Sequence, residues 1–368
     1  MSKEKTFTDF SIYESQKVEI NVKEDEIWTI SNPIEQQIKQ KIETIGTPLK
    51  DWDVKFYRGT TTGYNDAFLI DESLKNKLES ENINSLELIK PLLKGRDLMR
   101  YIYTPSNYYI ITTYPTLKIQ IQKYPAIEKH LSKFLPSLNQ TGEVGCRKKT
   151  NHKWFEYSDT TSYFKEFEKE KIIFSKASKI QAFCYDDDYN IVQNTGYILT
   201  GNNLKYFLSF LNSKLAKYIF LKFYQSGGIQ GEITIQAIEN IPIPKICLEI
   251  QQPFIEKADL MLRLNKELQL LVTKFMTLLQ SDFTIKKPTK KLENWYNLSW
   301  AEFEKELNKL KITLLGTQKE DWLDRFTRLK TQAISLKTEI DQTDKQIDAM
   351  VYELYGLTDE EIKIIENI

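Results

Sequence analysis

The stretch YRGTTTGYNDAFLID, from Tyr57 to Asp71, places a run of small and polar residues between two segments rich in aromatic and aliphatic residues. Gly59 and Gly63 permit a backbone with positive φ, and the Asn65 side chain can hydrogen-bond its own backbone, so the centre is expected to form a tight turn. The flanking segments are typical of short β-strands. The stretch therefore favours a sheet whose strands have short connections.

The same alternation of strand-like runs and turn residues continues through residues 50–245. Pro105, Asn107 and the Asp186–Asp188 run are examples of the turn signals, and helical pieces are expected near residues 125–138, 160–169 and 202–224. We therefore predict an α+β domain over residues 50–245, with a mixed, mainly antiparallel sheet. The strand-like runs are DVKFY, NDAFLID, NYYIITTY, EKIIFSK, QAFCY and TGYILTG.

Both ends of this domain have distinct patterns. Residues 1–49 are expected to form an N-terminal arm with one short amphipathic helix, because isoleucines recur at helical spacing before Gly46 and Pro48. The other end is ENIPIP, where Pro242 and Pro244 cannot donate ladder hydrogen bonds and hold the chain extended, so it is interpreted as a boundary strap. The isoleucines of the arm are Ile34, Ile38, Ile42 and Ile45.

Residues 246–368 show two long helical stripes of apolar residues, joined by a polar connector at 282–297. Spacings of three and four residues predict helices that pack antiparallel along a coiled-coil-like seam. The stripes favour core packing of a bundle, and this is compatible with a further role as a spacer that docks another protein or domain. Their members are Met261, Leu264, Leu268, Leu271, Phe275 and Leu278, then Trp322, Phe326, Leu329, Ala333, Leu336, Ile340, Thr343, Ile347, Met350 and Leu354.

Composition narrows the class of protein. The 368 residues include 51 basic and 51 acidic side chains, which excludes a histone-like polycation. The three cysteines lie far apart without a CxxC pair, which favours a reducing cytoplasm over a disulfide framework. The N-terminus lacks the apolar core of a signal peptide, and no run reaches the roughly 18 apolar residues of a membrane span. We expect a cytoplasmic protein without a membrane partner.

The sequence shows few catalytic motifs. It contains neither a GxxxxGK[ST] phosphate loop nor a GxGxxG fingerprint, and its single Asn-Pro lacks the second proline and aromatic residue of an amino-methyltransferase loop. We therefore predict no catalytic residue and no metal ligand in this chain. Asp53-Val54-Lys55 fits the short acidic-x-Lys pattern of a magnesium-dependent nuclease, so a nuclease with an unrecognised metal site stays open as an alternative.

Basic residues are concentrated in the middle of the chain. From Lys90 to Tyr185 there are 17 basic and 8 acidic residues, and aromatic residues are interleaved among them. A local basic surface on a neutral protein is typical of a polyanion partner, and arginine and amide side chains can also read base edges. The segment favours nucleic-acid binding.

Several strings, in order, resemble the TaqI-like C-terminal specificity domain of type IIG restriction–modification enzymes and adenine-specific DNA methyltransferases. The resemblance begins with YRGTTTGYNDAFLID and IKPLLKGRDLMRY and extends from about Trp28 to the C-terminus. The other strings are KYPAIEKHLSKFLPSL, KWFEY, KEKIIFSKAS, GYILTGNNLKYFLSFLNSKLAKYIF, ENIPIP and the tail TEIDQTDKQIDAMVYELYGLTDEEIKIIE.

The resemblance implies a target-recognition domain for double-stranded DNA, followed by a helical spacer. In such enzymes this region follows a methyltransferase, often with a nuclease in front, so the chain is expected to be a fragment or a stand-alone specificity subunit. A methyltransferase or endonuclease domain or subunit is then its partner, and that partner carries S-adenosylmethionine and magnesium. The alternative is a scaffold protein whose helices dock partner subunits.

Candidate DNA-facing residues are basic or amide side chains beside predicted turns. Arg58 and Arg96 follow or adjoin turn glycines, although Arg96 has the alternative of a salt bridge with a neighbouring acid. Thr62 and Asn65 favour a role in forming the turn over a role in reading DNA. The full set of candidates is Arg58, Thr62, Asn65, Lys94, Arg96, Arg147, Lys148, Lys149, Lys153, Lys176 and Gln181.

Overall fold

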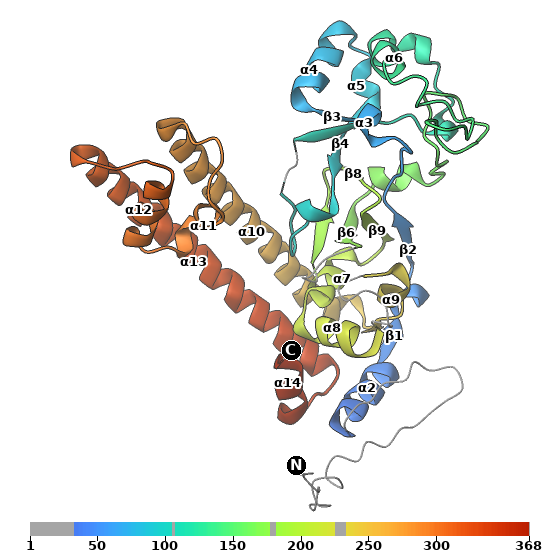
Figure 1. The fold of residues 1–368 in the computed structure, drawn as a ribbon. Coiled ribbons are helices and arrows are strands. Elements are labelled where there is room, and N and C mark those ends of the chain that lie inside the picture. The colour runs from blue at the N-terminus through green and yellow to red at the C-terminus, as the bar shows by residue number, and fades with distance from the viewer. Residues whose placement is uncertain (1–32, 105–106, 177–181, 225–232, 368) are drawn as a thin grey trace, which may run out of the picture.

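The computed structural model describes residues 33–104, 107–176, 182–224 and 233–367. These residues form an α+β body and a long helical arm that projects from it (Figure 1). The predicted fold class is confirmed, because nearly all strand pairs are antiparallel and the C-terminal region is helical. The exception is a short parallel pairing of Leu92 and Leu93 with Ile191 and Val192.

The body contains two four-stranded sheets. The first has the order β2 (Val54–Arg58), β9 (Gly196–Gly201), β6 (Lys171–Ser175) and β7 (Phe183–Asp186). The second has the order β3 (Leu69–Asp71), β5 (Tyr108–Ile111), β4 (Ile89–Leu93) and β8 (Ile191–Val192). Strands therefore occur in each of the six predicted runs, and β4 and β8 are additional.

Strand β6 contributes side chains to two hydrophobic cores, one on each face of its sheet. All five of its residues are buried. Ile172 and Phe174 pack into one hydrophobic core with helix α7 (Leu204–Leu211), whereas Ile173 packs into the second core with the other sheet. Successive side chains of a strand point to opposite faces, so a continuous apolar run is the pattern expected of a strand covered on both sides.

Short helices complete the body. Helix α8 (Lys214–Ile219) follows α7 in the first core. The others are α3 (Asn65–Phe68), α4 (Glu72–Glu81), α5 (Ser85–Leu88), α6 (Pro125–Ser132) and α9 (Ile235–Glu239), with 3-10 turns η1 (Leu49–Asp51), η2 (Gly95–Asp97), η3 (Pro115–Leu117), η4 (Ile121–Lys123) and η5 (Phe164–Glu168), and the π-helical turn η6 (Phe220–Tyr224).

The N-terminal helix and the proline strap lie together. Helix α2 (Pro33–Ile45) leads into β1 (Gly46–Pro48), which pairs antiparallel with β10 (Pro242–Pro244). A Cβ at Gly46 would lie 2.5 Å from the Cβ of Pro242, so only glycine fits this close approach. Ile38 and Ile42 of α2 are fully buried in the first core. This part of the predicted arm therefore packs as part of the body.

The arm consists of α10 (Leu248–Phe283), which runs outward, and α13 (Gly316–Leu354), which returns beside it (Figure 1). Most predicted stripe residues are buried between the helices, but towards the end of each helix the buried position shifts by one, to Leu279 and Val351. A straight helix has 3.6 residues per turn, so it drifts away from a 3.5-residue repeat. The part of the chain that the structure describes contains no helix long and apolar enough to cross a membrane.

The segment between the two long helices is not only a polar connector, as the sequence suggested. It folds into α11 (Lys290–Glu293), the turn η7 (Trp295–Asn297) and α12 (Trp300–Lys309). Trp295 is fully buried and stacks on Phe275 of α10, with ring centroids 3.8 Å apart. The apolar residues of this segment therefore close the end of the arm with a small aromatic core.

A polar joint connects the arm to the body. The Arg100 guanidinium donates hydrogen bonds of 2.7 and 2.6 Å to the Asp344 carboxylate of α13, and a third of 2.6 Å to the Asn212 carbonyl. Asp348, one helical turn further along α13, accepts from the Lys214 N–H at 2.8 Å. The C-terminal helix α14 (Asp359–Glu366) adds a contact, because Lys41 of α2 donates to Glu361 at 2.7 Å.

Candidate nucleic-acid interface

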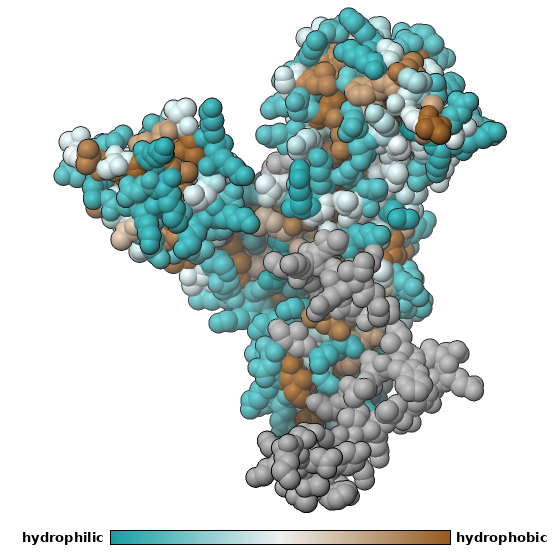
Figure 2. All heavy atoms as spheres, viewed as in Figure 1, coloured by the Kyte–Doolittle hydropathy of each residue, from teal (hydrophilic) through white to brown (hydrophobic). Residues whose placement is uncertain are grey.

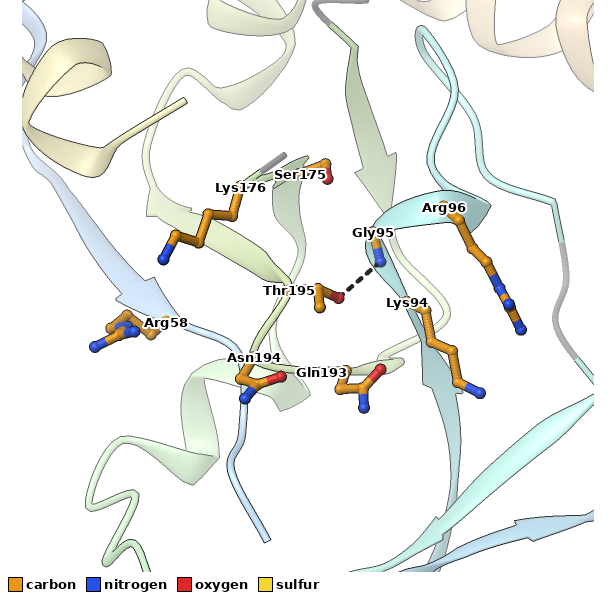
Figure 3. A pocket seen from close by; sticks show the side chains of 9 residues that line it. All are labelled: Arg58, Lys94, Gly95, Arg96, Ser175, Lys176, Gln193, Asn194 and Thr195. Carbon is orange, nitrogen blue, oxygen red and sulfur yellow. Dashed lines mark hydrogen bonds between the residues drawn. The ribbon is translucent and has the colours of Figure 1, made fainter. Parts of the chain in front are cut away.

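Four separate segments of the body meet at a polar pocket of about 580 Å³ (Figure 3). The segments are the end of β2, the turn η2 after β4, the end of β6, and the turn between β8 and β9. Because these strands pair with one another, residues distant in sequence are brought to one place. The pocket is lined by Arg58, Lys94, Gly95, Arg96, Ser175, Lys176, Gln193, Asn194 and Thr195.

Two glycines allow these segments to approach closely. A Cβ at Gly59 would lie 1.9 Å from the Gln193 carbonyl oxygen, and a Cβ at Gly95 would lie 2.6 Å from the Ser175 Oγ. The close approach also allows the Gly95 N–H to donate to the Thr195 Oγ1 at 3.1 Å. The glycine in YRG is therefore required for close backbone packing at the pocket, and the glycine in KGRD avoids a clash with the Ser175 side chain.

The charges at the pocket are of one sign. The described residues that line it include four cationic side chains and no carboxylate. Arg58 and Lys94 form no ion pair with a described acid, and the Lys94 Nζ lies 3.4 Å from the centroid of the Tyr108 ring. Burial lowers the pKa of Lys94, and the nearby Arg96 lowers it further, against the effect of Asp97. Such a cluster of like charges favours binding of an anion.

Arg96 remains available to a ligand. Its Nε lies 3.8 Å from an Asp97 carboxylate oxygen, and 68% of its side chain is exposed. Asp97 is already engaged, because its other oxygen accepts the Lys94 N–H at 2.8 Å. Asp97 thus interacts more strongly with the Lys94 N–H of the turn than with the Arg96 guanidinium.

Arg147 has a structural role, which differs from the predicted contact with DNA. Only 5% of the residue is exposed. Its guanidinium donates to the carbonyl oxygens of Leu138, Thr62, Glu156 and Trp154 at 2.6–3.1 Å. Burial lowers its pKa to about 10. The side chain satisfies loop carbonyls that have no strand partner, and it is not positioned to reach a phosphate.

Thr62 and Asn65 form the turn, as the sequence favoured. Thr62 is buried, and its hydroxyl donates to the Asn65 Oδ1 at 2.9 Å and accepts from the Tyr64 N–H at 3.1 Å. Lys148, Lys149 and Lys153 are exposed but do not line the pocket. Gln181 lies outside the described residues. Of the predicted set, the structure therefore brings together Arg58, Lys94, Arg96 and Lys176.

Sequence reasoning missed the turn at Gln193, Asn194 and Thr195. These three polar residues lie between the apolar pair Ile191–Val192 and the strand GYILTG. The available signal was the polar run followed by Gly196, which is typical of a turn between strands. It could not reveal that the turn packs beside Gly59 and Gly95.

The carboxylates singled out by the sequence have partners within the fold. The fully buried Asp186 pairs with the fully buried Lys171 at 2.6 Å, and it also accepts backbone N–H groups of Asp188 and Asn190. Asp53 accepts from the Asn202 amide at 2.7 Å. Within the described residues, no group of three or more His, Cys, Asp or Glu side chains could hold a metal ion.

Residues 90–243 match the family of TaqI-like C-terminal specificity domains. This range contains most of the pocket and confirms the resemblance, and residues 57–71 lie before it. Residues 90–243 are therefore similar to a TaqI-like specificity domain. Residues 248–351, which include α10 and most of α13, match a domain of unknown function, DUF8810. No curated protein matches the chain.

The solved structure of a restriction–modification enzyme resembles the chain in fold. The type IIL restriction-modification enzyme MmeI, solved in complex with DNA, has a TM-score of 0.51 and 12% identity, covering 87% of this chain and 35% of its own. The type IIG restriction endonuclease BpuSI has a TM-score of 0.42 and 14% identity, covering 88% and 33%. The chain spans about a third of the length of these enzymes.

Proposed function

We propose that the chain is the DNA-recognition module of a restriction–modification enzyme, with double-stranded DNA bound at the basic pocket. The observation that carries this proposal is the cluster of Arg58, Lys94, Arg96 and Lys176, gathered from separate strands within and beside a TaqI-like specificity domain. Like charges are costly to gather unless a ligand neutralises them, and the phosphates of a duplex provide that neutralisation.

The pocket offers two kinds of contact. The cationic side chains suit phosphates, which fix the position and orientation of a protein on DNA without carrying sequence information. The amide and hydroxyl groups of Gln193, Asn194 and Thr195 suit base edges, which do carry it. A site that combines both kinds of group on a rigid strand framework is suited to sequence-specific binding.

Catalysis is assigned to a partner in this proposal. A methyltransferase and endonuclease part, as a separate domain or subunit, would hold S-adenosylmethionine and magnesium, while this chain sets the position on DNA. Support comes from the family match and from the absence, in this sequence, of phosphate-loop, dinucleotide and amino-methyltransferase motifs. The arm is suited to transmit that position, because Arg100 and Asp344 hold α13 to the segment directly after the η2 turn.

The test is selection of bound DNA from a randomised duplex library at near-physiological salt. We expect enrichment of one motif of several base pairs, and weaker binding of the variant Arg58→Ala/Lys94→Ala/Arg96→Ala, with a salt slope reduced by about 3. The matched control Lys286→Ala/Lys287→Ala/Lys290→Ala removes as many exposed charges from the end of the arm and should keep the affinity.

Two outcomes contradict the proposal. Absence of binding even at low salt would exclude a DNA-recognition role for this chain and favour the scaffold alternative. Equal losses from the pocket variant and the arm variant would show that the pocket is not the binding site.

A further inference from the structure

The turn at residues 193–196 is held rigidly by three parts of the body. The Gln193 N–H donates to the Leu93 carbonyl of β4 at 2.9 Å, and the Lys176 N–H after β6 donates to the Thr195 carbonyl at 2.9 Å. The Gly196 N–H closes the turn on the Gln193 carbonyl at 2.8 Å. Strands β4, β6 and β9 therefore fix the backbone of this turn.

Close packing adds to this rigidity. The Gly59 N–H donates to the Gly196 carbonyl at 2.8 Å, and a Cβ at Gly196 would lie 2.7 Å from the Val192 Cγ1. The backbone of Gln193 forms a parallel bridge with Thr60. The turn thus packs closely against the residues that follow β2 as well.

Two side chains of this rigid turn, those of Gln193 and Asn194, are left without partners among the described residues, whereas the Thr195 hydroxyl accepts from the Gly95 N–H. The amides of Gln193 and Asn194 form no hydrogen bond within the described part of the chain, and Asn194 is exposed. In the pocket they lie between cations, with Arg58 and Lys176 on one side and Lys94 and Arg96 on the other (Figure 3). A fixed backbone that presents free amides is the arrangement expected of a group that recognises a ligand, since binding costs little reorganisation.

We propose that the Gln193–Asn194 pair reads an adenine edge in the major groove, while the cations on both sides hold the flanking phosphates. An amide donates to adenine N7 and accepts from its N6 amino group, whereas arginine and lysine have no acceptor for that group. The pair therefore supplies what the cations of the pocket lack. This assignment deepens the proposed function and rests on it.

The first experiment compares library selections with the full chain and with Gln193→Ala and Asn194→Ala. The full chain should enrich an A·T pair at one position, and the variants should lose that preference by roughly tenfold or more while keeping the other positions of the motif. Arg58→Ala is the matched control from the same pocket. It should weaken binding to all sequences alike and reduce the salt slope by about 1.

The second experiment identifies the atoms. The selected adenine is replaced by 7-deazaadenine, which lacks the N7 acceptor and keeps the base pair. Binding by the full chain should fall roughly tenfold, and the Gln193→Ala/Asn194→Ala variant should show no additional loss, because the contact is already absent.

The outcomes separate this inference from the proposed function. If the amide variants enrich the same motif as the full chain, or if 7-deazaadenine weakens the variant and the full chain equally, the adenine assignment is overturned and DNA recognition by the pocket stands. If the full chain binds no DNA at low salt, both are overturned. Each variant must unfold at the same temperature as the wild type. A loss of base preference then results from the lost contact and not from a damaged fold.

Discussion

Arg96 and Arg147 occur in similar basic stretches, Lys94–Arg96 and Arg147–Lys149, but the fold uses them in opposite ways. Arg96 is mostly exposed, whereas Arg147 is buried among four carbonyl groups. The difference arises from the neighbouring backbone. Carbonyls at the pocket are already paired, as those of Gln193 and Thr195 show, while the irregular loop around Arg147 leaves carbonyls that need a donor. A basic stretch is therefore free to bind DNA only where the backbone is satisfied without it.

The largest effect on stability is expected at Arg147. Arg147→Ala leaves the carbonyls of Leu138 and Trp154 without a donor among the described residues and removes one of two donors from those of Thr62 and Glu156. Buried acceptors without partners are costly, so the free energy of unfolding should fall by about 3 kcal/mol. Urea unfolding, followed by circular dichroism, measures the change.

The adjacent Lys148 provides the control. It is exposed, so Lys148→Ala should change the free energy of unfolding by less than about 0.5 kcal/mol. Equal urea midpoints for the Arg147 and Lys148 variants would mean that the buried guanidinium does not hold the loop, and the contrast with Arg96 would be lost.

Arg100 is an intermediate case, half-buried and paired. Arg100→Ala breaks the bidentate contact with Asp344 and the bond to the Asn212 carbonyl, and should lower the free energy of unfolding by about 2 kcal/mol, since solvent screens part of the interaction. A double-mutant cycle with Asp344→Ala isolates the pair and should give a coupling of about 1 kcal/mol. Strict additivity of the two single variants would show that the joint is held by apolar packing alone.

The strands were predictable because their signal is local, and most of the site was not. The β-branched and aromatic runs mark six strands, but β8 is a pair of residues, Ile191–Val192, too short to stand out. Likewise, Arg58, Lys94 and Arg96 could be chosen from charge and nearby glycines. Their convergence on one pocket depends on pairings such as Arg58 with Tyr197, which no local pattern encodes.

The predicted set contains one misassigned residue and omits one turn, and both have physical causes. Arg147 was misplaced because its acceptors come from residues as distant as Thr62. The Gln193–Asn194 turn was missed because its position in the pocket depends on contacts with Gly59 and Lys176, which directly follow other strands. Composition alone does not show which polar groups form hydrogen bonds within the fold and which remain available to a ligand.

The carboxylate of Asp348 is largely buried, so its negative charge is destabilising in the folded state. Burial, opposed by the Lys214 N–H and reinforced by Asp344, raises the pKa of Asp348 to about 6. The folded state thus binds this proton more tightly than the unfolded state does, so the contribution of Asp348 to stability is fully present below about pH 4 and is lost as the pH rises through 6. Asp348→Asn keeps the acceptor for Lys214 and should be more stable than the wild type by about 1 kcal/mol at pH 7.

The measurement is the free energy of unfolding from urea titrations between pH 4 and pH 7. The difference between Asp348→Asn and the wild type should grow over this interval. A constant difference would show that Asp348 does not titrate there.

Arg96 should give the smallest change in stability and completes the comparison with Arg147. The side chain of Arg96 is 68% exposed and lies 3.8 Å from Asp97, so Arg96→Ala should change the free energy of unfolding by less than about 0.5 kcal/mol. Its DNA affinity, measured by fluorescence anisotropy with a selected duplex at two salt concentrations, should nevertheless fall roughly tenfold with a salt slope reduced by about 1. Arg96→Lys retains the charge and should recover most of the affinity, because a phosphate contact needs the charge more than the planar fork. An Arg96→Ala variant with unchanged affinity would place the DNA elsewhere, and then exposure of a basic side chain would not by itself mark the binding surface.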